Sequence, residues 1–231
     1  MKANAKLFDR KSLSEQVEEA LKEEIISGTL APGERVDLQA YSKRWSVSPT
    51  PLRDAAKRLE VNGLLEVSPR RGVFVAQLDW AALKEIFELR IALECMGIRL
   101  ATPLVPANVA DYTLEKYKHA EDMSDAENRQ KHLQKIDNLI HDVGVKYCGN
   151  KRLMTMMLDL QDLIRWSRRT LIRNLQEPLD LTLPEHIRIC EAVRARDADL
   201  AEKAMRIHLE NSWQRAQGFL SDEEKATPSP R

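Results

Sequence analysis

Three histidines and one aspartate in the second half of the chain have the residue types of a metal site. Asp137 and His141 are four residues apart, a spacing that on a helix places both side chains on one face about one turn apart. His186 and His208 follow in two later segments that have helical periodicity. One carboxylate and three imidazoles form a ligand set suited to Zn²⁺, Ni²⁺, Mn²⁺ or Fe²⁺. A divalent metal ion is therefore one interpretation of this group.

The same four residues also have a simpler interpretation. An Asp-x-x-x-His pair arises often by chance, and a single histidine on a helix is usually a surface or core residue. Spacing alone leaves both interpretations open. The two remaining histidines, His119 and His132, lie in surroundings rich in lysine and glutamate, and we expect them to be solvated.

A charged residue interrupts an apolar helical stripe upstream of these histidines. The stripe consists of Leu83, Ile86, Leu93, Gly97 and Leu100. Arg90 lies within it, where a charge is costly unless it is paired. A guanidinium can hold a carboxylate through two parallel hydrogen bonds, so Arg90 is a candidate for binding a small organic acid. An internal ion pair with Glu94, or a side chain that reaches out to water, stays open as an alternative.

The segments that would position these residues are all helical. The periodicity predicts six helices after residue 78, over 79–102, 106–123, 126–147, 150–174, 184–194 and 197–220. Helices of this number and length form an antiparallel bundle. The last residues, 223–231, are polar and contain two prolines, and we expect a disordered tail there.

The first third of the chain has a different organisation. Ser48 is expected to cap a helix with its side-chain oxygen, and Pro49 and Pro51 suit the first turn of that helix. Asn62 and the glycine after it end the helix. Two short alternating strands follow, at 65–67 and 73–75, around a five-residue loop.

Two further helices precede this stretch, near residues 12–28 and 37–44. Together these elements predict a winged helix-turn-helix domain over residues 1–77 and an all-helical domain over residues 78–222. The fold class is therefore mainly α, with one β-hairpin.

Composition is that of an ordinary globular protein. The 231 residues are 43% hydrophobic and 31% charged, and 36 basic residues balance 36 acidic ones. Neutrality by itself argues against nucleic-acid binding, but residues 43–75 contain seven basic and three acidic side chains. Because salt screens distant charges, this local excess is sufficient to attract phosphates. The basic residues are Lys43, Arg44, Arg53, Lys57, Arg58, Arg70 and Arg71.

Cysteine usage and hydropathy indicate the cellular compartment of the protein. The three cysteines are widely spaced and form no Cys-x-x-Cys pair, which indicates buried thiols in a reducing compartment. The sequence contains no signal peptide and no apolar run of about 18 residues. We therefore expect a cytoplasmic protein without a membrane partner.

Residues 31–75, APGERVDLQAYSKRWSVSPTPLRDAAKRLEVNGLLEVSPRRGVFV, closely resemble the winged helix of GntR-type bacterial transcription regulators. The resemblance implies that Ser48, Thr50 and Arg53 contact DNA from a recognition helix, and that Arg70 and Arg71 contact it from the wing. Many relatives have arginine where this chain has Pro49. Because proline cannot make a bidentate contact to guanine, the operator sequence of those relatives does not transfer.

Residues 79–220 resemble the FCD ligand-binding domain, in its VanR-like or FadR-like forms, that follows the winged helix in one GntR subgroup. That domain has Asp-x-x-x-His, a Gly-Asn helix boundary and two later histidines, matched here by Asp137, His141, Gly149-Asn150, His186 and His208. The resemblance implies that all four are metal ligands. The expected six helices favour the VanR-like branch over the seven-helix, acyl-CoA-binding branch.

Three functions are consistent with these observations. The first is a regulator, by analogy a repressor, that binds a palindromic operator as a homodimer and responds to a small organic acid. Four protein ligands would leave an octahedral ion two positions for such an acid. The second is a regulator that senses the metal itself. The third is a helical metalloenzyme, which we disfavour because no nucleophile–base pair accompanies the ligands.

Overall fold

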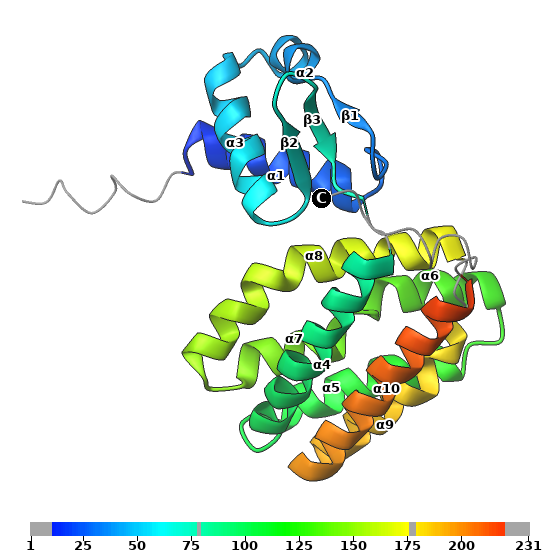
Figure 1. Ribbon diagram of the computed structural model, residues 1–231. Helices are drawn as coiled ribbons and strands as arrows, with labels where there is room; N and C mark the ends of the chain where they lie inside the picture. Colours follow the sequence, from blue (N-terminus) through cyan, green and yellow to red (C-terminus); the bar gives the residue numbers. More distant parts are fainter. Residues whose placement is uncertain (1–10, 78–79, 176–178, 220–231) are drawn as a thin grey trace, which may run out of the picture. The chain divides into compact units, whose positions relative to one another are not determined.

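The computed structural model of the protein describes residues 11–77, 80–175 and 179–219 (Figure 1). The chain divides into two compact units between residues 78 and 79. This division lies one residue from the expected boundary of the two domains. The expected disordered tail, 223–231, lies outside the described residues.

The N-terminal unit consists of three helices and a small sheet. Its elements are α1 (Leu13–Ile26), β1 (Arg35–Val36), α2 (Leu38–Trp45), α3 (Pro49–Val61), β2 (Leu65–Ser68) and β3 (Gly72–Val75). The strands are antiparallel in the order β1-β3-β2, with Val73 opposite both Val36 and Val67. Strand β1 was not predicted, because two residues are too few to show alternation. The predicted winged helix-turn-helix is confirmed.

Local signals fix the positions of the first helices. Ser12 and Glu15 form a capping box at the start of α1, and the carboxylate of Asp37 accepts two backbone N–H groups at the start of α2. Helix α3 packs on α1 through a buried face. That face consists of Leu52, Ala55, Ala56 and Leu59.

One expected cap is wrong. Ser48 occupies the N-cap position of α3, but its side chain makes no capping hydrogen bond. An N-cap oxygen accepts from the second or third residue of the helix, and the third residue here is Pro51, which has no N–H. The Ser48 side chain is exposed and is not used in holding the helix.

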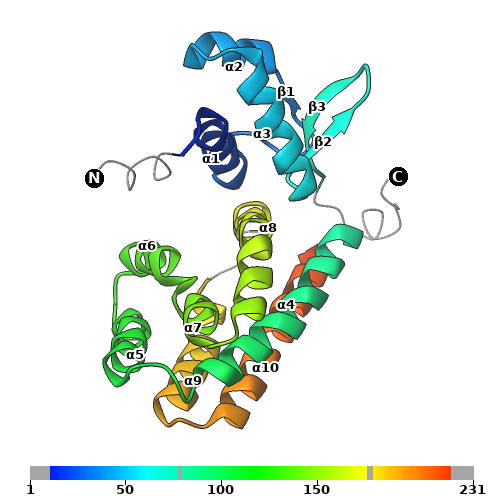
Figure 2. The same cartoon turned by 90° about the vertical axis from the view of Figure 1, so that its left-hand side faces the viewer.

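The C-terminal unit is all-helical, with the core along the contacts between its helices. Its elements are α4 (Trp80–Ala101), α5 (Ala107–Glu121), α6 (Ala126–Ile136), α7 (Leu139–Tyr147), α8 (Lys151–Leu175), the 3-10 turn η1 (Leu179–Leu181), α9 (Leu183–Arg194) and α10 (Ala198–Phe219). Helices α4 and α10 run side by side, and α9 packs on α10 and on α5 (Figures 1 and 2). The predicted helical domain is confirmed.

The helix expected over 126–147 is interrupted. Helix α6 ends at Ile136 and α7 begins at Leu139. Counted as one interrupted helix, α6 and α7 give the expected six helices among the described residues, and counted separately they give seven. Helix number therefore does not separate the two branches of the FCD resemblance.

Two glycines bring α4 and α7 close together. A Cβ atom added to Gly144 of α7 would lie 3.3 Å from the backbone nitrogen of Ile98 on α4. A Cβ atom on Gly97 of α4 would lie 3.5 Å from the Gly144 carbonyl oxygen. Glu94 and His141 each lie three residues before one of these glycines. The close approach of the two backbones therefore places Glu94 beside His141.

Candidate functional site

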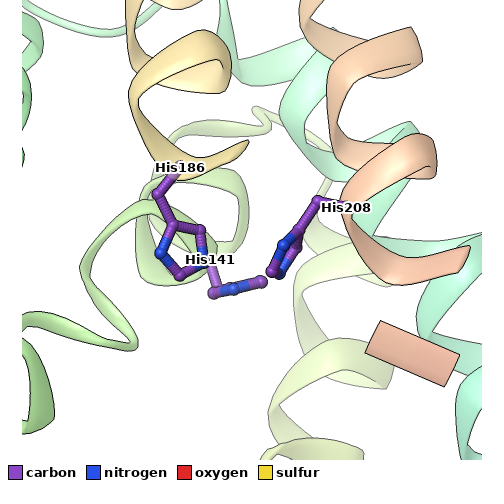
Figure 3. Close-up of side chains that lie close together, drawn as sticks. All are labelled: His141, His186 and His208. Atoms are coloured by element: carbon purple, nitrogen blue, oxygen red, sulfur yellow. The ribbon is translucent and has the colours of Figure 1, made fainter. Parts of the chain in front are cut away.

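Three of the four predicted metal ligands meet in the C-terminal unit. The imidazoles of His141, His186 and His208 come from α7, α9 and α10 and converge on one point (Figure 3). All three side chains are buried. One ring nitrogen from each lies within 4.8 Å of the others, and the ring centroids are 4.5–5.5 Å apart. Three helices that are distant in sequence thus contribute to one cluster.

A carboxylate lies behind two of the three imidazoles. Nδ1 of His141 contacts Oε2 of Glu94, and Nδ1 of His208 lies 2.8 Å from Oε2 of Glu185. A glutamate that accepts Nδ1–H leaves Nε2 with its lone pair toward the centre of the cluster. The two glutamates therefore select the tautomer that a metal ion requires.

Each of these glutamates is in turn paired with an arginine. Arg90 Nε donates to Glu94 Oε1 over 2.7 Å, and both residues are buried. Arg215 donates to both oxygens of Glu185, over 3.0 and 3.1 Å, and Asn211 adds a bond of 2.8 Å. The series Arg–Glu–His thus occurs twice, once on each side of the cluster.

These pairs keep the carboxyls of buried Glu94 and half-buried Glu185 ionised. Burial alone would raise the pKa of Glu185, but hydrogen bonds from His208, Arg215 and Asn211 lower that pKa to about 2. Burial likewise acts to raise the pKa of Glu94, and the charge of Arg90 and the hydrogen bond from His141 hold it well below its ordinary value. Both glutamates are therefore charged acceptors at neutral pH.

The cluster fits a divalent metal ion. Within the described part of the chain, no hydrogen bond reaches the buried Nε2 atoms of His141 and His186, although both residues have other contacts. Metal–nitrogen bonds of about 2.0–2.1 Å place two ligands of one ion at most about 4.2 Å apart. Ring nitrogens already within 4.8 Å of one another need only a small movement to share an ion.

Asp137, the fourth predicted ligand, stands apart from this group. Its carboxylate is buried, but it does not belong to the set of ligand atoms that lie within 4.8 Å of one another. Asp137 lies at the end of α6, while His141 lies on α7. The prediction assumed one continuous helix from Asp137 to His141, whereas the structure interrupts that helix at residues 137–138.

Arg90 adopts the paired alternative that the sequence left open. Its side chain is 2% exposed, bonds to Glu94 and lies over the ring of Phe87 at 5.0 Å. Arg90 is thus in contact with the carboxylate that orients a histidine. Its predicted contact with an effector stays a prediction.

A small pocket lies beside the cluster, between α7 and α8. Its volume is about 30 Å³, enough for a water-sized occupant. Glu94 and His141 form one side, and Gln161 and Arg165 of α8 form another. The guanidinium of Arg165 pairs with Asp162 at 3.0 Å and is partly exposed. The pocket therefore leads from the surface to the edge of the histidine cluster.

The predicted DNA-contacting side chains all lie at the surface of the N-terminal unit. They are Ser48, Thr50 and Arg53 at the start of α3, and Arg70 and Arg71 between β2 and β3. Arg58, on the same helix, pairs instead with Glu18 of α1 at 3.3 Å. Among the described residues, Arg53 and Arg70 form no ion pair. The start of α3 and the hairpin tip thus present basic groups to solvent.

The hairpin tip is held in a defined turn. The N–H of Arg71 donates to the Ser68 carbonyl over 3.1 Å, and Arg70 has a φ of 66°. A left-handed conformation costs roughly 1 kcal/mol for a residue with a side chain, which explains why glycine is common at such positions. The arginine keeps its charge there at that cost. The guanidinium of Arg71 lies over the Phe74 ring at 5.9 Å.

Sequence reasoning missed the supports of the metal cluster. Glu94 was considered only as a partner for Arg90, and Glu185 and Arg215 were not considered. Glu185 directly precedes His186, and adjacent residues on one helix point their side chains in different directions. The contact of Glu185 with His208, which lies on another helix, therefore has no sequence signal. Arg215 follows His208 by seven residues on α10, a spacing that shares a face and could have suggested a relation.

The remaining candidates behave as ordinary residues. His119 is exposed, as expected, and His132 is half-buried with Nε2 3.2 Å from the Lys116 carbonyl oxygen. Cys95, Cys148 and Cys190 are buried free thiols. No helix among the described residues has the length and hydropathy needed to cross a lipid bilayer.

A winged helix followed by a helical unit with a buried ligand cluster defines a DNA-binding regulator with a sensing domain. Comparison with known families agrees, since "Bacterial regulatory proteins, gntR family" matches residues 13–75 and "FCD domain" matches residues 85–211. The chain therefore belongs to the GntR family of transcription regulators and has an FCD domain. The relatives below are regulators, not enzymes, so the metalloenzyme hypothesis has no support.

Similar proteins cover nearly the whole chain. The HTH-type transcriptional repressor RspR of Escherichia coli (strain K12) is 26% identical over 219 residues, 91% of each chain. The HTH-type transcriptional repressor GlaR of the same strain is 29% identical over 197 residues, 82% of this chain and 89% of that one. The solved structure of E. coli McbR/YncC has a TM-score of 0.69 at 22% identity, over 90% of this chain and 99% of its own, which shows the fold.

The two carboxylates behind the histidines give a direct test of the cluster. Glu94→Gln and Glu185→Gln should each lower divalent metal affinity by about 10–100-fold, because an amide holds Nδ1–H weakly and can present the wrong group. Metal affinity would be measured by competition with a chelator. Glu191→Gln is the control, since Glu191 lies on α9 with Glu185 but pairs with Lys118 at the surface, at 3.0 Å. Unchanged affinity in both variants would contradict the assignment.

Proposed function

We propose that this GntR-family regulator is a repressor whose DNA affinity is controlled by a small carboxylate bound next to a metal ion in the FCD domain. The observation that carries this proposal is the buried cluster of His141, His186 and His208, oriented by two ionised glutamates. The repressor names of RspR and GlaR support the direction of control. We place the protein in the cytoplasm, with DNA as its macromolecular partner.

The metal ion would be held by the three histidines and by Asp137. Imidazole nitrogens and a carboxylate suit Zn²⁺, Ni²⁺, Mn²⁺ or Fe²⁺. Asp137 lies buried one short segment before His141, and a modest movement of the residues between α6 and α7 would add its carboxylate to the ligand set. When bound, the ion would supply open coordination positions for an acid.

The pocket beside His141 is the proposed entry for that acid. Arg165 and Gln161 offer a cation and an amide at its α8 side, and His141 lies at its inner side. A carboxylate could thus contact the metal at one end and Arg165 at the other. Because the pocket holds about 30 Å³, the side chains of α8 would have to move to admit an organic acid. Such movement of α8 is one way in which binding of the acid could change DNA affinity.

Arg90 remains a proposed effector contact, with a condition that the structure adds. Because its guanidinium is buried against Glu94, an acid could contact it only by displacing that carboxylate. Removing Arg90 would also leave the buried charge of Glu94 without its cationic partner, with the His141 hydrogen bond remaining. We therefore expect Arg90→Ala to lower stability, whereas Arg165→Ala should reduce effector affinity alone.

DNA binding is proposed to use the start of α3 and the hairpin tip. Ser48, Thr50 and Arg53 would enter the major groove, and Arg70 and Arg71 would contact the backbone or the minor groove. Their exposure supports this arrangement, as does the strained conformation of Arg70. A residue that keeps its charge at a cost in backbone energy is consistent with a functional role.

Arg53 and Arg71 should have different effects on operator binding. If Arg53 contacts a base, Arg53→Ala should reduce the free energy of operator binding by about 1–3 kcal/mol per half-site, and the size of this loss should depend on the DNA sequence. Arg71→Ala should weaken binding to all sequences and reduce the salt slope by about one. Binding would be measured by fluorescence anisotropy at several salt concentrations. Arg58→Ala is the control, since Arg58 pairs with Glu18. Wild-type binding by both test variants would refute this interface.

A homodimer is the proposed form on DNA, because two-fold symmetry doubles the contact and matches a palindromic operator. Leu89 and Met96, seven residues apart on α4, are 44% and 45% exposed and form an apolar stripe that a second copy could cover. Sedimentation should give twice the mass of one chain at micromolar concentration. Met96→Glu should weaken the dimer, and Leu200→Glu, at an exposed leucine of α10, should not. A monomeric wild-type protein would contradict this proposal.

Removing a metal ligand should abolish both metal content and response to the acid. His208→Ala should lose metal by elemental analysis, melt at a lower temperature and show no thermal shift with small carboxylates, because metal affinity adds to folding free energy. His119→Ala and His132→Ala should behave as wild type. Wild-type protein that binds no divalent ion would contradict the metal centre. A change in DNA affinity caused by metal alone would instead favour the metal-sensing alternative.

A further inference from the structure

The interruption between α6 and α7 contains an inserted side chain. In a continuous helix the Ile140 N–H would donate to the Ile136 carbonyl, four residues earlier. Here the hydroxyl of Tyr117 lies between them. It donates to the Ile136 oxygen over 2.8 Å and accepts from the Ile140 nitrogen over 3.3 Å. A hydroxyl that enters the backbone hydrogen-bond ladder is a recognised cause of a helix break.

The two halves of the interrupted helix pack on different neighbours. Helix α6 lies against α5 and η1, whereas α7 lies against α4 and α8. The break lies where one set of neighbours is replaced by the other. The break therefore sets the direction in which α7 leaves α6, and with it the place of His141 beside Glu94.

Tyr117 also contacts His186, the second histidine of the cluster. Its ring centroid is 5.0 Å from that of His186, and the Tyr117 side chain is fully buried. His141 and His208 are oriented by Glu94 and Glu185. One tyrosine thus supports His186 with its ring and the backbone before His141 with its hydroxyl.

We propose that Tyr117 is a positioning residue of the metal centre. Its hydroxyl keeps the helix open at residues 137–138, and this opening fixes where Asp137 and His141 lie relative to His186. The proposal rests on the metal centre proposed above. It differs from a role in stability alone, in which the hydroxyl would only satisfy two backbone groups left by the break.

The test uses Tyr117→Phe, which keeps the ring against His186 and removes the hydroxyl. Tyr112→Phe is the matched control, since Tyr112 lies on the same helix and is 53% exposed. The affinity for Zn²⁺ and Mn²⁺ would be measured by chelator competition on the full chain, and melting temperatures with and without metal. We expect Tyr117→Phe to weaken metal binding about tenfold or more, and to reduce the upward shift in melting temperature caused by metal. Tyr112→Phe should change neither.

A role in stability alone would give a different result. In that case Tyr117→Phe would lower the melting temperatures of metal-free and metal-loaded protein equally and leave metal affinity unchanged, which would overturn the proposal. Wild-type protein that binds neither ion would instead refute the metal centre itself.

A measurement on wild-type protein covers the case in which the variant does not fold. Metal should slow hydrogen exchange at the Ile140 amide more than at that of Ile98, which is equally buried. Equal slowing at the two amides would count against the proposal.

Discussion

The hydrogen bonds that two imidazoles donate to buried Glu94 and half-buried Glu185 are the constraint on which the helical unit depends. Glu94 joins α4 to α7, and Glu185 joins α9 to α10, so each bond ties together two helices. A buried carboxylate that loses its partners costs about 3–5 kcal/mol. None of these four helices can shift far without that cost, and the cluster is therefore kept in place before any ion binds.

This rigidity bears on how a ligand could change DNA affinity. A ligand shifts an equilibrium only by the difference between its affinities for two states. Helices α7, α9 and α10 are fixed by the cluster, whereas α8 contributes the side of the pocket that has no histidine. Helix α8 is thus the side of the pocket that no histidine of the cluster holds, and the pocket side chains Gln161 and Arg165 would report a change in its position.

The sequence was sufficient for the local features and insufficient for the tertiary ones. The capping box at Ser12 and the helical periodicity are encoded within a few residues, so the element order followed from the sequence. The break at residues 137–138 depends on Tyr117, about 20 residues earlier, and no local signal marks it. Likewise, three histidines could be chosen by type, but the contact of Glu185 with His208 exists only in the folded unit. The prediction that the Ser48 side chain caps α3 was wrong for a local reason, because the absence of an N–H at Pro51 can be deduced from the sequence.

Two prolines at the start of α3 constrain how this regulator could evolve to bind a different operator sequence. Since Pro49 and Pro51 lack an N–H, Thr50 supplies the one amide donor among the first three residues of the helix. A change of Pro49 to arginine would add a side chain that can contact guanine, restore a backbone donor and loosen the chain before folding. One codon would thus alter base contact, backbone hydrogen bonding and chain stiffness together. Divergence at this position is expected to proceed by abrupt steps in specificity.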